Sequence, residues 1–390
     1  MSPRKATTPE SAEPTEAATG EDVVPDAQPT TLDELVRSST ILITCGSGGV
    51  GKTTTAAVLA MEAAKVGRRA VVVTIDPAKR LADALGLSGS IDNTPRQIPG
   101  DWAGELWAVM LDTKSTFDEL VQRYSTEPEQ AERILGNRFY RNISGALSGT
   151  QEYMAMEKLH ELHANSSFDL VVVDTPPTRH ALDFLDAPRR LTRFLDHRLY
   201  RTLMAPTRGM MRAVNVAAQA FLRTLSKVVG GEVLDDALAF FSAFQGMEEG
   251  FRARANEVLE LLTDPSTSYV LVASPKRDTV EEAQFFADRL REAGLPVRAL
   301  IVNRMHPKFT DAPPGAVRAL ADGHAGSDLG DLYRNLADFA LVAEREEQHL
   351  VGLSESIGSS AVVRVPFLSS DVHDLVGLAE LAGHLFVEPA

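Results

Sequence analysis

A glycine-rich segment near the N-terminus, GSGGVGKT, has the spacing of a phosphate-binding loop. Glycines let backbone N–H groups turn inward around phosphate oxygens, where a Cβ atom would obstruct them. We expect Lys52 to reach the β- and γ-phosphates and the Thr53 hydroxyl to bind Mg²⁺. An apolar run, Ile41–Cys45, precedes the loop and a helical stretch, Lys52–Lys65, follows it, which favours a nucleotide site over an ordinary turn. The residues expected to bind the nucleotide are Gly46, Ser47, Gly48, Gly49, Val50, Gly51, Lys52, Thr53 and Thr54.

Two aspartates follow apolar strands and are candidates for the chemistry at the phosphates. Asp76 comes directly after the run Ala70–Ile75, and Asp174 directly after Leu170–Val173. A carboxylate in this position beside a phosphate loop usually binds Mg²⁺ or its water, and we assign that role to Asp174. Asp76 is then available to orient the attacking water. The alternative for both is a helix N-cap, because aspartate before proline or Thr-Pro often starts a turn.

The elements that must position these residues alternate between strands and helices. Further apolar runs of strand length lie at Leu106–Met110, Tyr269–Ala273, Ala299–Val302 and Ala361–Val365. Such runs, separated by helices, indicate a mostly parallel sheet covered on both faces, an α/β doubly wound fold of the phosphate-loop NTPase type. Ligands bind such sheets at the carboxyl ends of the strands.

Two stretches, about 113–165 and 183–262, contain no strand pattern and predict a helical subdomain inserted into the sheet domain. One helix is expected from Met210, and a second carries Leu234, Leu238, Phe241, Phe244, Met247 and Phe251 on one face. Residues 1–30 carry five prolines and six acids and predict a disordered acidic tail. Thr31-Leu-Asp-Glu34 has the capping-box pattern and should open the first helix. Residues 31–390 are expected to form the phosphate-loop NTPase domain.

Three segments together resemble the ATPases of arsenical pumps and of tail-anchored-protein targeting, a branch of the deviant phosphate-loop class. They are GSGGVGKTT at the loop, DPAKRLADAL at residues 76–85 and DTPPTRHAL at residues 174–182. IVNRM and VPFLSSDV resemble the adenine-side segments of that family, which implies that Asn303 and Pro366 contact the base. The resemblance covers most of residues 40–386. It implies ATP and Mg²⁺ as ligands, and a dimer that closes around ATP and opens after hydrolysis.

The sequence departs from that family in ways that affect function. Members usually carry a lysine at the second loop position that reaches the partner's phosphates, and here this residue is Ser47. A heterodimer with a lysine-bearing paralogue would restore the charge, as would Lys79, Arg80 or Arg179 of the same chain; a self-sufficient homodimer is the other possibility. The chain has a single cysteine, Cys45, so the zinc-binding cysteine pair of targeting members is missing and arsenite binding through thiols is disfavoured.

A basic stretch at residues 189–227 contains nine basic side chains and one acid within a chain of net charge −15. A basic amphipathic helix can bind an anionic membrane surface, or a membrane-protein client with an acidic flank. The alternative is an ordinary helical subdomain whose apolar face is its core. The nine basic residues are Arg189, Arg190, Arg193, Arg198, Arg201, Arg208, Arg212, Arg223 and Lys227.

The leading functional prediction is an ATPase switch that couples hydrolysis to the handling of a membrane-protein client or a membrane pump partner. The alternatives are a partitioning-type surface ATPase, a small-molecule phosphotransferase and a nucleotide-binding pseudoenzyme. A partitioning-type protein often ends in a basic helix, whereas residues 366–390 contain no lysine or arginine. The 39 basic and 54 acidic residues argue against nucleic-acid binding. No apolar run is long enough to span a bilayer, so we expect a cytoplasmic protein that could associate peripherally with a membrane.

Overall fold

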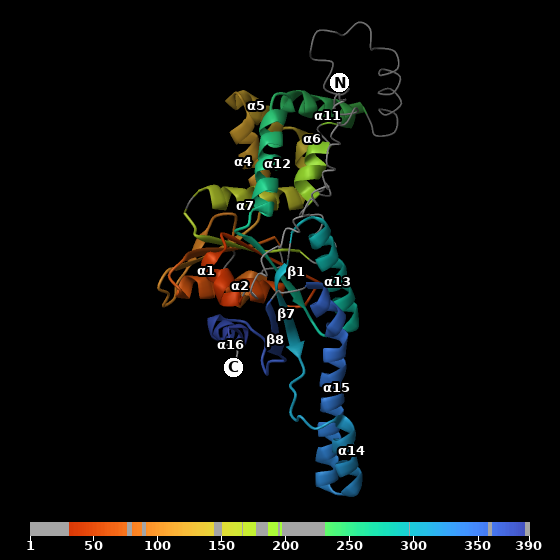
Figure 1. Ribbon diagram of the computed structural model, residues 1–390. Helices are drawn as coiled ribbons and strands as arrows, with labels where there is room; N and C mark the ends of the chain where they lie inside the picture. The colour runs from red at the N-terminus through yellow and green to blue at the C-terminus, as the bar shows by residue number, and fades with distance from the viewer. Residues whose placement is uncertain are drawn as a thin grey trace, which may run out of the picture.

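The structure is a computed structural model that describes residues 31–75, 80–87, 91–143, 150–165, 167–176, 186–193, 196, 231–295, 297–357 and 361–386. Within these residues eight strands form one sheet in the order β3-β4-β2-β5-β1-β6-β7-β8 (Figure 1). All neighbouring strands are parallel except β3 and β4. The strands are β1 Ile41–Gly46, β2 Arg69–Thr74, β3 Arg96–Ile98, β4 Glu105–Met110, β5 Leu170–Asp174, β6 Thr267–Ala273, β7 Val297–Met305 and β8 Ala361–Pro366. This confirms the predicted doubly wound α/β fold.

The central strand β1 shows why both faces of the sheet must be covered. All six of its residues are buried. Because side chains alternate along a strand, Ile41 and Ile43 enter one core and Leu42 enters the other. Helices α1 Leu32–Ser38, α2 Lys52–Lys65 and α16 Leu375–Leu385 contribute to the core that contains Leu42. Helices α7 Thr150–Ala164, α12 Glu248–Thr263 and α13 Arg277–Glu292 contribute to the other core.

Local sequence signals determine where several helices begin and end. The predicted capping box at the start of α1 is present: the Thr31 hydroxyl accepts from the Glu34 amide, and the Glu34 carboxylate accepts from the Thr31 amide. Helix α2 spans the predicted residues. The single helix predicted across Leu234–Phe251 is wrong. Gly246 has a φ of 91°, and the chain instead forms α11 Gly231–Phe244 and then α12. A left-handed glycine ends a helix even where the apolar pattern continues.

A layer of helices lies above one end of the sheet (Figure 1). It contains α4 Thr113–Tyr124, α5 Pro128–Leu135, α6 Arg138–Ile143, α7, α11 and α12. Aromatic rings fill the space between them; Phe244 and Phe251, for example, are stacked with centroids 5.1 Å apart. The tail 1–30 and the helix expected from Met210 lie outside the described residues. None of the described helices is both long and apolar enough to cross a membrane.

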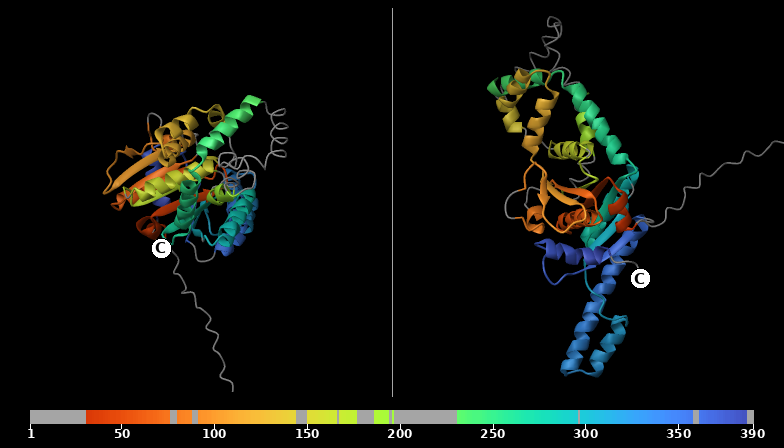
Figure 2. Two further views of the ribbon diagram at one scale, coloured as in Figure 1. Left: turned by 90° about the horizontal axis from the view of Figure 1, so that it is seen from above. Right: turned by 90° about the vertical axis from the view of Figure 1, so that its left-hand side faces the viewer.

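A helical hairpin projects from the opposite end of the molecule (Figures 1 and 2). It consists of α14 Pro314–Gly323 and the 30-residue helix α15 Asp328–Ile357. Two consecutive glutamates attach α15 to the sheet. Glu346 accepts hydrogen bonds from the backbone N–H and Nδ1 of His306, at 2.8 and 2.7 Å. Glu347 receives two hydrogen bonds from the Arg364 guanidinium, at 2.9 and 3.0 Å.

Candidate nucleotide site

The glycine-rich loop connects the end of β1 to the start of α2, and two of its glycines are required by geometry. A Cβ atom on Gly46 would lie 2.0 Å from the carbonyl oxygen of Val272 on neighbouring β6. A Cβ atom on Gly51 would lie 2.4 Å from Asn303 Nδ2, and Gly51 has a φ of 100°. No other residue type fits either position without displacing backbone or an amide side chain. The loop therefore has the tight course expected of a phosphate cradle.

Lys52 is 7% exposed, and its ammonium lies against the loop. Its Nζ donates a hydrogen bond to the carbonyl oxygen of Ser47 across 2.8 Å. The Ser47 side chain is 2% exposed, and its hydroxyl has no hydrogen-bond partner among the described residues. The lysine charge is thus placed at the loop through backbone rather than through the serine side chain.

Asp174, at the end of β5, lies beside the first residues of α2. Its Oδ2 accepts hydrogen bonds from the Thr53 hydroxyl at 2.7 Å and from the Thr74 hydroxyl at 2.9 Å, and the aspartate is 1% exposed. The sheet order places β5 between β1 and β2, so three strand ends meet at this carboxylate. A carboxylate next to a threonine hydroxyl is the kind of oxygen donor set that Mg²⁺ prefers. The residues present therefore fit a magnesium ion.

Asp76 lies outside the described residues, but both backbone polar groups of the preceding residue, Ile75, are hydrogen-bonded. The backbone N–H of Ile75 donates to the Asp174 carbonyl at 3.3 Å. The Ile75 carbonyl accepts from Gln151 Nε2 on α7 at 2.9 Å. The segment that carries Asp76 thus starts from a point fixed both by the sheet and by the helical layer.

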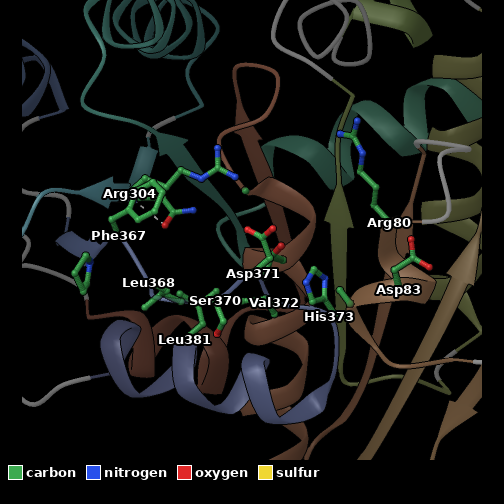
Figure 3. Close-up of a pocket in the computed structure, with 15 residues that line it drawn as sticks. Arg80, Asp83, Arg304, Phe367, Leu368, Ser370, Asp371, Val372, His373 and Leu381 are labelled. Atoms are coloured by element: carbon green, nitrogen blue, oxygen red, sulfur yellow. Dashed lines mark hydrogen bonds between the residues drawn. The ribbon is translucent and has the colours of Figure 1, made fainter.

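A cavity of about 460 Å³ opens beside the loop, a size that suits a small organic ligand. The α2 N-terminus, α3 Arg80–Ala84, the end of β7 and the segment after β8 enclose it. In the view of Figure 3, Arg304 and Phe367 lie on one side of the cavity, Arg80 and Asp83 lie on the other, and Asp371 lies between them. The lining residues include Gly51, Thr54, Asn303, Arg304, Pro366, Phe367, Asp371 and His373.

Both residues that the sequence analysis assigned to the base line this cavity. Asn303 also bridges β7 to the loop: its Nδ2 donates to the Val50 carbonyl at 2.9 Å, and its Oδ1 accepts from the Arg304 amide at 2.9 Å. The sequence analysis missed Arg304 and Phe367, although both lie inside the adenine-side segments that it quoted. Their neighbours Asn303 and Pro366 were the signal that could have identified them.

Cys45, next to the loop, has no features of a reactive thiol. It is 1% exposed at the end of β1. Burial raises the pKa of its thiol to about 12, and the nearby Lys52 charge offsets that effect only in part. A thiol with so high a pKa is a poor nucleophile and a poor metal ligand near neutral pH. Arsenite binding through this thiol is therefore disfavoured by its burial and its pKa as well.

Comparison with known proteins adds independent information. A model of the anion-transporting ATPase family matches residues 39–319. The chain is 27% identical over 351 residues to ATPase GET3 of Malassezia globosa, covering 85% of this chain and 95% of that protein. It is 24% identical over 287 residues to ATPase get3 of Schizosaccharomyces pombe, covering 72% and 78% of the two chains. It is 25% identical over 271 residues to the putative arsenical pump-driving ATPase 2 of Aquifex aeolicus, covering 67% and 79%.

Proposed function

Because the chain belongs to the anion-transporting ATPase family, we propose that it binds ATP in the cavity and loop described above and uses its hydrolysis as a conformational switch. The observation that carries this proposal is the convergence of Lys52 and Thr53, at the start of α2, with Asp174, at the end of β5, beside a cavity of nucleoside size. The phosphates would lie against the loop, on the positive N-terminal end of α2. The base would lie toward Asn303 and Pro366.

Each site residue has a distinct proposed role in hydrolysis. Lys52 would bind the β- and γ-phosphates and stabilise the charge that develops on them. Asp76 would orient the water whose oxygen attacks the γ-phosphorus, while the bond from that phosphorus to the bridging oxygen breaks and ADP leaves. Thr53 and Asp174 would hold Mg²⁺, which supplies charge neutralisation at the phosphates when bound.

We further propose that the working unit is a dimer and that its client is a membrane protein or membrane pump partner. The description of the matched family, anion-transporting ATPase, and the name of the Aquifex relative, a putative arsenical pump-driving ATPase, support the pump partner. The inserted helices, about 113–165 and 183–262, are proposed as a subdomain that contacts the client. Of the basic stretch 189–227, the described residues Arg189, Arg190 and Arg193 are exposed, as a contact with an acidic partner or an anionic membrane requires.

The first experiment is steady-state ATP hydrolysis by the purified chain over a range of protein concentrations, with Lys52→Ala as the matched variant. Turnover per chain that rises with concentration and is lost in Lys52→Ala supports a self-sufficient dimeric ATPase. ATP binding without turnover supports a pseudoenzyme or a subunit that awaits a lysine-bearing paralogue. ATP binding that is unchanged in Lys52→Ala contradicts the proposed site.

Two further experiments test the heterodimer and the role of the basic stretch. Mixing the chain with a lysine-bearing paralogue should raise ATP turnover if the working unit is a heterodimer, and unchanged turnover would exclude the heterodimer. Replacing Arg208 and Arg212 by glutamate should abolish binding to anionic vesicles or to a membrane-protein client if the basic stretch is a docking surface. Binding that survives both replacements would make this stretch purely structural.

A further inference from the structure

The end of β7 contains a backbone irregularity next to the phosphate loop. The register between β7 and β8 shifts between Val302 and Met305, so Asn303 and Arg304 form a bulge. Arg304 has a φ of 64°, and among the described residues it is the non-glycine residue with a positive φ. This conformation is unfavourable for a residue with a Cβ atom. Strained residues of this kind persist where the surrounding structure requires them, and they cluster at functional sites.

The bulge directs two consecutive side chains onto two consecutive carbonyl groups of the loop. Asn303 Nδ2 donates to the Val50 carbonyl at 2.9 Å, and Arg304 Nη1 donates to the Gly49 carbonyl at 3.0 Å. Gly48 and Gly49 form the exposed tip of the loop and have no side chains that could anchor it. The Arg304 guanidinium therefore supplies, from β7, an anchor that the loop's own sequence cannot provide.

The chemistry of this contact favours phosphate binding in two ways. A hydrogen bond that fixes an outward carbonyl also fixes the orientation of the adjoining peptide N–H, which is the group that binds phosphate oxygens. A guanidinium is charged at all physiological pH values and has five donors, so it can bond the carbonyl and still attract an anion. Ser47, in the same loop, contributes no charge, which leaves the exposed Arg304 as a cation at the rim of the tip.

We propose that Arg304 is a positioning residue for nucleotide binding: it anchors the tip of the phosphate loop and adds a positive charge at its rim. The inference rests on the proposed ATP site and deepens it. The charge should favour ATP over ADP, because ATP carries the additional phosphate, and the preference should weaken with salt. The left-handed backbone at Arg304 allows the role of the side chain in binding to be separated from its effect on stability. Glycine adopts a φ of 64° without strain, so Arg304→Gly removes the guanidinium without straining the fold.

The test compares Arg304→Gly, Arg304→Gln and Arg304→Lys in the full-length chain. Arg298→Gln, about 20 Å away along the same strand, is the control for loss of an arginine from β7. We expect Arg304→Gly to melt at or above the wild-type temperature yet to bind ATP about five- to tenfold more weakly, with a smaller loss for ADP. Arg304→Gln should weaken ATP binding to a similar extent and lower the melting temperature. Arg304→Lys should retain part of the wild-type affinity for ATP. Amide exchange in the peptide that covers Gly46–Thr53 should be faster in Arg304→Gly.

The outcomes distinguish this inference from the proposed function. If Lys52→Ala abolishes ATP binding but Arg304→Gly binds ATP and ADP as the wild type does, the ATP site stands and the role of Arg304 is wrong. If Arg304→Gly lowers the melting temperature and weakens the binding of ATP and of ADP to the same extent, Arg304 merely supports the fold. The inference is again wrong in that case. If the wild-type chain itself binds no ATP, the proposed function is wrong, and the inference about Arg304, which rests on it, is wrong as well.

Discussion

The Thr53 hydroxyl donates a hydrogen bond to Asp174 across 2.7 Å, although the two residues are 121 positions apart in the sequence. The contact exists because β5 lies directly beside β1, with Thr44 opposite Asp174 in the register. A second hydroxyl, from Thr74 on β2, reaches the same carboxylate oxygen. The end of β5 is therefore the point at which the loop, the second strand and the segment toward Asp76 are joined.

Asp174→Asn should preserve the shape of this junction and remove its charge. We expect ATP hydrolysis to fall by about 100-fold or more, and the Mg²⁺ dependence of nucleotide affinity to be lost, because an amide is a poor ligand for that ion. Steady-state hydrolysis and nucleotide titrations at varied Mg²⁺ measure both effects. Asp169→Asn, just before the other end of β5, should keep both properties. Retention of Mg²⁺-dependent affinity in Asp174→Asn would show that the ion binds elsewhere.

Gly51→Ala should disrupt the loop for two separable reasons. The new Cβ would meet Asn303 Nδ2 at 2.4 Å, and the φ of 100° is unfavourable for alanine. We expect ATP binding to be lost in Gly51→Ala and partly restored in the double variant Gly51→Ala/Asn303→Ala, which removes the steric conflict but not the backbone strain. Nucleotide titrations of the wild type, both single variants and the double variant together form a double-mutant cycle. Simple additivity of the two losses would mean that the contact with Asn303 is not the obstacle.

Ser47→Ala should leave ATP turnover unchanged, because Lys52 bonds the backbone carbonyl of this residue and not its side chain. Removing a buried hydroxyl that has no partner among the described residues should be neutral, or stabilise the fold by up to about 1 kcal/mol. Thermal melts and hydrolysis assays check both expectations. A marked loss of turnover would instead assign the hydroxyl itself a role at the phosphates.

Glu157 on α7 predicts a pH dependence of stability. The residue is 2% exposed, and burial raises the pKa of its carboxyl from 4.5 to about 7, against the favourable contacts with Tyr153 and Arg254. The folded state therefore binds this proton more tightly than the unfolded chain does. The stabilisation is complete below about pH 4.5 and is lost as the pH rises toward 7. The titratable and charged groups around it are Tyr153 and His160 on α7, Arg254 and Glu257 on α12, and Arg123 and Tyr124 on α4.

Glu157→Gln isolates this effect, because glutamine keeps the shape and cannot ionise. The free energy of unfolding of Glu157→Gln relative to the wild type should increase by roughly 3 kcal/mol between pH 4.5 and 8. His160, whose pKa is lowered by burial and by Arg254, acts in the opposite direction but is common to both proteins. Urea unfolding at several pH values measures the difference. A difference that does not vary with pH would mean that Glu157 is already ionised in the fold.

The sequence was most informative where a local pattern determines the structure. Continuous apolar runs predicted β1, β2, β4, β5, β6, β7 and β8 to within a few residues, and the capping box predicted the start of α1. The three-residue strand β3 was missed because it has too few residues for a pattern. The break at Gly246 was missed because the apolar face continues across it. Both errors come from relying on the periodicity of apolar residues. Periodicity cannot reveal a strand as short as β3, and it does not register the single backbone angle at Gly246 that ends a helix.

Arg304 shows the limit of sequence analysis at the site. Arginine carries no preference for a positive φ, so nothing in IVNRM predicts a bulge that turns two side chains toward Gly49 and Val50. That geometry depends on how β7, β8 and the loop pack together. Lys52 and Asp174 could be predicted because their positions follow from a short motif and from the end of a strand.

The attachment of α15 through Glu346 and Glu347 gives the hairpin a mechanical property. The 18 residues from Asp328 to Arg345 lie beyond this attachment and extend about 27 Å at helical rise. The attached residues, His306 and Arg364, lie close in the sequence to Arg304 and Phe367, which line the cavity. The hairpin is thus an arm whose attachment lies next to the cavity. A tilt of roughly 5° at this attachment would move the far end of the arm by about 2 Å.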